Sequence, residues 1–179
     1  MAYFYLVASL PLLALDRDTP WSPEEFYYYC ENLLSPPDLR DLRRIVDGEL
    51  DGLVHPAARH WAGVETQLRN ALARARAARA GMGVSPPQRP YDGFDVRAER
   101  AAAEAMGAAD PLERELILDK HRWHLLEEMA GGLDSFGAAA VFSYALRLRI
   151  AQKWQSLTEE KGRAVVEGIV EDNVAGNVA

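Results

Sequence analysis

The chain has 179 residues, 49% of them hydrophobic, and a formal net charge of −7 at pH 7. A chain of this length can bury a sizeable core without disulfides or metal, so we expect residues 1–179 to form a single helical domain. The negative charge argues against nucleic acid or anionic lipid as the main partner, because both need a basic face that displaces counterions. The single cysteine, Cys30, cannot form an internal disulfide, which fits a reducing cytoplasm.

The residue pattern predicts an all-α protein. Alanine is abundant, arginine outnumbers lysine, and alternating Val, Ile and Thr are almost absent, so a helical bundle is expected. The first residues, MAYFYLVASLPLLALD, superficially resemble a signal sequence. They lack basic residues before the apolar run and are interrupted by Pro11, so we expect Tyr3 to Leu15 to be buried core, as a short helix or an extended segment. No other segment is long enough to insert into a membrane.

Serine or aspartate followed by proline marks three helix starts, because the side chain caps the helix and proline suits its first position. The helices expected from this signal begin at Pro23, Pro36 and Pro111 and end near Leu34, Gly48 and Gly131.

The longest helical signal in the first half runs from Pro56 to Arg79. Its narrow, alanine-rich second half predicts close packing against one partner helix in a long helical hairpin. Prolines interrupt the segment 84–94, which is either the tip of that hairpin or a domain boundary. Helix resumes from Asp95 to about Met106.

Residues Phe136 to Gln155 are expected to form a central helix with apolar stripes on two faces, which needs neighbours on both sides. The spacing of Ser156 and Glu159 resembles a capping box, and Gly162 weakens helix continuity, so we expect a break or kink near Leu157. The two stripes of the central helix comprise Leu146, Ile150, Trp154 and Leu157 on one side and Val141, Tyr144 and Leu148 on the other. After the break, a last helix would carry Ala164, Val165 and Ile169, together with Val166 and Val170.

One predicted helix concentrates residues that could hold a metal: Glu115, Asp119, His121, His124, Glu127 and Glu128. His121, His124 and Glu127 follow one another at one-turn spacing, so two or three of them could reach one ion. A metal site in a bundle needs ligands from several helices, and no matching second set exists in the sequence. We therefore expect these residues to be exposed or to face a partner, with a metal-binding protein or enzyme as the alternative.

Five arginines are candidates for binding an acidic protein partner: Arg69, Arg76, Arg79, Arg147 and Arg149. The simplest interpretation of the first three, which share one helix face, is a solvated flank. Neither a Gly-x-Ser-x-Gly elbow nor a glycine-rich phosphate loop is present in the sequence, so we expect a non-catalytic protein without a cofactor.

Four segments together resemble a family of short, uncharacterised bacterial proteins encoded among the subunits of V-type (A-type) rotary ATPases. The segments are YFYLVASLP from Tyr3 to Pro11, the Trp61-x-x-x-Glu65-x-x-x-Arg69 helix, DPLERELILDKHRW from Asp110 to Trp123, and YALRLRIAQKW from Tyr144 to Trp154 followed by Gly162.

The final third is also loosely similar to the central-stalk subunit of these ATPases known as C, or d in eukaryotes, which is all-helical and much longer than this chain. The resemblance implies a cytoplasmic subunit or assembly factor that binds other subunits of the ATPase and is peripheral to the membrane through that complex.

Overall fold

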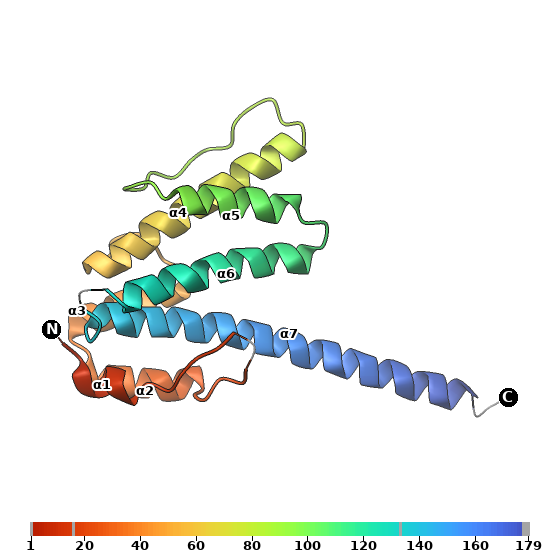
Figure 1. The fold of residues 1–179 in the computed structure, drawn as a ribbon, viewed down its shortest axis with the longest axis horizontal. Helices are drawn as coiled ribbons and strands as arrows, with labels where there is room; N and C mark the ends of the chain where they lie inside the picture. The colour runs from red at the N-terminus through yellow and green to blue at the C-terminus, as the bar shows by residue number, and fades with distance from the viewer. Residues whose placement is uncertain (1, 16, 133, 177–179) are drawn as a thin grey trace.

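A computed structural model describes the backbone of residues 2–15, 17–132 and 134–176, and the side chains of this part up to Leu157 (Figure 1). Its helices are α1 (Phe4–Ser9), α2 (Pro23–Leu33), α3 (Pro36–Asp47), α4 (Pro56–Arg79), α5 (Val96–Gly107), α6 (Pro111–Ala130) and α7 (Ala138–Gly176). The described residues form no strand, only an isolated antiparallel bridge between Ala2 and Gly137. The all-α prediction is confirmed.

The predicted caps set the helix boundaries. The Ser22 hydroxyl accepts from the backbone N–H of Glu25 while the Glu25 carboxylate accepts from the N–H of Ser22, which completes a capping box. The side chains of Ser35 and Asp110 cap α3 and α6 by accepting from the backbone N–H of Asp38 and of Leu112. Gly48 ends α3 with φ at 80°, a left-handed conformation that favours glycine.

Helices α4, α5, α6 and α7 lie side by side in chain order, α1 and α2 lie on the opposite side of α7 from α6, and α3 contacts both α4 and α7 (Figure 1). The central helix is therefore sandwiched as its two stripes predict. Tyr144 and Leu148 on one stripe and Leu146 and Ile150 on the other are all buried. The expected start at Phe136 shifts to Ala138, because Gly137 pairs with Ala2 in the bridge.

The long helical hairpin is not confirmed. Helices α4 and α5 lie side by side, but α4 has 24 residues and α5 only 12. The segment 84–94 runs back along α4, where two buried amides hold its backbone. Gln67 exchanges hydrogen bonds with the backbone N–H and carbonyl of Asp95 at 2.8 and 2.9 Å, and Asn70 does so with Arg89 at 3.1 and 2.8 Å.

The break predicted near Leu157 is wrong, because α7 is one helix from Ala138 to Gly176. Its second part extends beyond the other helices as an arm (Figure 1). The Ser156 hydroxyl donates to the Lys153 carbonyl at 2.8 Å, so this side chain bonds back to the preceding turn and does not cap a new helix.

The N-terminal segment is buried only in part, which corrects the prediction of a buried segment over Tyr3 to Leu15. Leu6 and Leu13 lie in the core, whereas Phe4, Tyr5 and Leu12 are 63%, 78% and 89% exposed. A helix as short as α1 can turn only one side to the core. Among the described residues, none of the helices combines the length and the apolar character required to cross a membrane.

Candidate functional site

A buried network of charged side chains joins α4, α6 and α7. Arg122 on α6 donates from Nε to Oε2 of Glu65 on α4 at 3.0 Å and from Nη1 to Oδ1 of Asp119 at 2.9 Å. Trp154 Nε1 on α7 donates to Oδ2 of Asp119 at 2.9 Å, and the Lys153 ammonium pairs with the same carboxylate. Glu65 and Asp119 are 4% and 1% exposed. Two buried carboxylates therefore connect three helices.

Cationic side chains lie within hydrogen-bond or ion-pair distance of both carboxylates of this network. Oε1 of Glu65 also accepts from Arg69 Nε at 2.8 Å and from Arg122 Nη2 at 3.2 Å. Burial by itself would lower the pKa of Arg122, but the adjoining carboxylates of Glu65 and Asp119 raise this pKa above its ordinary value. The arrangement holds charges in fixed positions, so it suits a cross-link between helices better than proton transfer.

A cavity of about 410 Å³ lies beside the network and is lined by two of the five candidate arginines, Arg69 from α4 and Arg149 from α7. Arg69 is engaged with Glu65 at 2.8 Å. Arg149 is exposed and shares the cavity wall with Lys153. These two arginines thus belong to one basic surface.

The other three candidate arginines lie elsewhere. Arg76 and Arg79 are exposed at the C-terminal end of α4, where Arg79 Nη1 donates to the Met106 carbonyl at 3.1 Å. Arg147 is packed between α7 and α6, with its guanidinium 5.5 Å from the centroid of the Trp123 ring. Burial lowers the pKa of Arg147. The five arginines therefore do not form a single binding surface.

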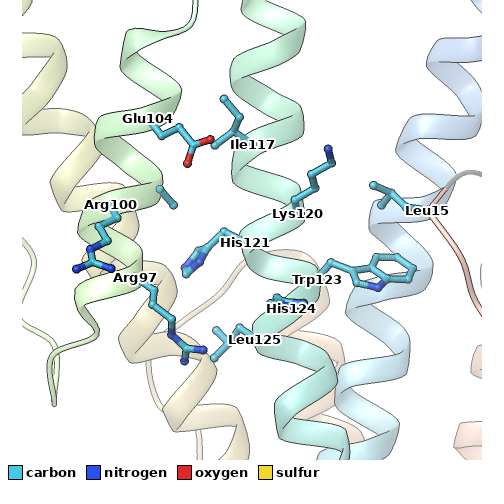
Figure 2. Close-up of a pocket in the computed structure, with 11 residues that line it drawn as sticks. Leu15, Arg97, Arg100, Glu104, Ile117, Lys120, His121, Trp123, His124 and Leu125 are labelled. Atoms are coloured by element: carbon cyan, nitrogen blue, oxygen red, sulfur yellow. The ribbon is translucent and has the colours of Figure 1, made fainter.

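The three candidate metal ligands, His121, His124 and Glu127, do not converge. The His121 ring lies between α6 and α5 (Figure 2), and its Nε2 is buried without a hydrogen-bond partner among the residues that the structure describes. His124 is 81% exposed with Nδ1 3.6 Å from Oε2 of Glu127, whose Oε1 accepts from Trp123 Nε1 at 3.0 Å. Among the residues that the structure describes, no group of three or more His, Cys, Asp or Glu side chains could hold a metal ion. The described geometry therefore does not favour the metal alternative.

A larger groove, of about 650 Å³, runs over α5 and α6 (Figure 2). We call it the α5–α6 groove. Its lining extends over both sides of α6, because His121 points toward α5 whereas Trp123 points toward α7 and Leu15 (Figure 2). The apolar residues are Leu15, Ala101, Ile117, Trp123 and Leu125; the others are Arg97, Arg100 and Glu104 from α5, and Lys120, His121 and His124 from α6.

The α5–α6 groove carries a local excess of positive charge on an acidic protein. Arg97 is neutralised, because it pairs with Glu128 at 2.6 Å and with Asp95 at 3.0 Å. Arg100 and Lys120 have neither a hydrogen bond nor an ion pair to any described residue. These two side chains are therefore available to an anionic partner.

His121 is partly buried in the groove. Burial lowers the pKa of His121; the carboxylate of Asp95 opposes this shift, and the guanidinium of Arg97 adds to it. The lowered pKa favours the neutral ring at pH 7, so His121 adds little positive charge to the groove.

Sequence reasoning singled out Arg69, Asp119 and His121, but it did not identify Arg122, Arg97, Arg100 or Lys120 as members of these two sites. The spacing of Glu65 and Arg69 is visible as an i,i+4 pair, but the third member, Arg122, comes from a helix 57 positions away. Arg97, Arg100 and Lys120 are ordinary surface residues in the sequence. Only the contact between α5 and α6 brings them to one groove.

The chain is similar, over residues 100–176, to a family described as protein of unknown function (DUF2764). This region begins within α5 and ends with α7, so it includes Arg100, Lys120, Asp119 and Arg122. No curated protein and no solved structure matches the chain.

Proposed function

We propose that this chain is a non-catalytic helical subunit or accessory protein of a bacterial V/A-type rotary ATPase, and that it binds other subunits of that complex. It would act in the cytoplasm and reach the membrane only through the ATPase. The resemblance of four segments to a family encoded with such ATPases is the starting point of this proposal.

The positions of those four segments in the fold support treating them as one pattern. Glu65, Arg122 and Trp154, from three of the segments, meet in the buried network. The fourth segment supplies Tyr3, whose hydroxyl binds the Asp38 carboxylate and accepts from the Ser35 backbone N–H at 3.1 Å. The resemblance therefore rests on side chains that hold the bundle together.

The arm of α7, residues 158–176, is the observation that carries the proposal of partner binding. Both apolar stripes of the first part of α7 are covered by other helices up to Ile150, so neither stripe is bare there. The helix then continues past the bundle (Figure 1). A helix that extends beyond its own bundle has surface that another protein can bind.

The sequence of the arm also favours a partner. Val165, Val166, Ile169 and Val170 recur at helical spacing and would form one apolar stripe. Gly162 and Gly168 each cost an isolated helix about 1 kcal/mol relative to alanine. A helix with this composition gains stability when its stripe is covered.

Affinity purification of the tagged chain from its own cells under gentle conditions, followed by mass spectrometry, tests the proposal. We expect rotary-ATPase subunits to be captured by the natural chain and lost with the double variant Val166→Asp and Ile169→Asp. A control with two aspartates on the bundle surface, at the exposed positions Ala78 and Ala103, should capture them normally. Absence of ATPase subunits from the natural chain's capture would overturn the proposal.

A further inference from the structure

We propose that the α5–α6 groove is a docking site for the arm, residues 158–176, of a second copy of this chain. The exchange would be reciprocal, with each copy placing its arm in the groove of the other. This inference concerns self-association and goes beyond the proposed binding of ATPase subunits.

The groove has the shape and chemistry that an amphipathic helix requires. Ala101, Ile117 and Leu125 form an apolar strip between α5 and α6, and a third helix can lie along such a strip as in other helix-in-groove complexes. Arg100 on the α5 wall and Lys120 on the α6 wall have no partner among the described residues. An acidic helix with one apolar stripe would satisfy both features.

The arm has the sequence of an acidic helix with one apolar stripe. Residues 158–176 contain five acidic and two basic residues around the stripe of Val165, Val166, Ile169 and Val170. On a helical wheel, Glu167 and Asp172 flank this stripe on opposite sides, as a pair of cationic walls requires. The arm would be about 28 Å long at 1.5 Å per residue, close to the roughly 30 Å of α6.

The arm cannot reach the groove of its own chain. α7 is continuous from Ala138 to Gly176 and carries the arm away from the bundle (Figure 1). Folding back onto α5 and α6 would require a break near Leu157, where the helix has none. A second copy can present its arm without bending it, and reciprocal exchange closes the assembly at two copies.

Docking in this way places self-association and partner binding in competition, because both use the arm. A copy whose arm is bound in the groove of the second copy cannot use that arm to bind another protein. Excess ATPase partner should therefore convert the two-copy form to a one-to-one complex.

Sedimentation equilibrium of the full-length chain over about 1–100 μM tests the inference. We expect a dimer that weakens at high salt, because paired charges at the surface are screened. The double variant Arg100→Glu and Lys120→Glu should dissociate at least tenfold more readily. Arg40→Glu with Arg59→Glu is the matched control, since both arginines are exposed, on α3 and α4, and the charge change is identical.

A charge exchange identifies the docked segment. Adding Glu167→Lys and Asp172→Lys to the groove variant should restore the dimer, while circular dichroism confirms that every variant is folded. A natural chain that stays monomeric, or equal effects of the groove and control variants, would overturn the inference. A failure of the exchange to restore the dimer would overturn the assignment of the arm as the occupant. None of these results depends on the capture of ATPase subunits, so the two proposals can fail separately.

Discussion

Arg122 is the residue on which the buried network depends. Its guanidinium pairs with both Glu65 and Asp119, and its side chain is only 18% exposed. Arg122→Leu would leave two buried carboxylates with fewer cations, and removal of one partner from a buried ion pair typically costs about 3–5 kcal/mol. We expect a loss of that size in the free energy of unfolding, measured by urea titration at pH 7.

Arg43 provides the comparison for this prediction. Its ion pair with Glu31 at 2.6 Å is exposed, with about half of each side chain in solvent. Exposed pairs contribute about 0–1 kcal/mol, so Arg43→Leu should change stability little. Equal losses in the two variants would show that burial of the network does not determine its contribution.

Helix α4 organises its neighbours through two buried amides, and this can be tested at the level of the element. Gln67→Met keeps the volume of the side chain but removes both hydrogen bonds to Asp95. Unpaired buried backbone groups cost about 1–3 kcal/mol, so stability should fall by that amount. Hydrogen exchange should accelerate in the segment 84–94. Val84→Met, at an exposed position in the same segment whose side chain forms no hydrogen bond, should cause neither effect.

Helix boundaries could be predicted from the sequence because their causes are local. Ser22, Ser35 and Asp110 bond to backbone groups two or three residues away, so the sequence contains both partners of each contact. The same local rule failed at Ser156, because a serine hydroxyl can also bond to the preceding turn. A capping pattern thus predicts a helix start only where a breaker such as proline supports it.

The candidate sites were harder to predict, because their residues meet across helices. His121 and Glu127 are six positions apart, about 120° around α6, so His121 lies toward α5 while Glu127 lies within 3.6 Å of Arg147 on α7. Their spacing along α6 suggested that both could reach one ion. In the fold, however, the two side chains face different neighbouring helices. The pairing of Glu65 with Arg122 likewise depends on how α4 and α6 pack, which no local pattern specifies.

At the scale of the whole molecule, one hydrophobic core includes residues from every helix, from Leu6 on α1 to Ile150 on α7. The family match covers only residues 100–176, and the segment 84–94 divides the chain near its middle. These two facts would suit a protein of two domains. The shared core and the hydrogen bonds from Gln67 to Asp95 across that segment favour the single domain predicted from the sequence.

Cooperative unfolding distinguishes these two organisations. Tryptophans report on different parts of the bundle, since Trp21 lies before α2, Trp61 on α4, Trp123 on α6 and Trp154 on α7. With a single core, urea transitions followed by tryptophan fluorescence and by far-ultraviolet circular dichroism should have the same midpoint. Variants that keep only Trp61 or only Trp123 extend the comparison to each side of the segment 84–94. Distinct midpoints for these two variants would instead show that α4 and α6 belong to separately folding units.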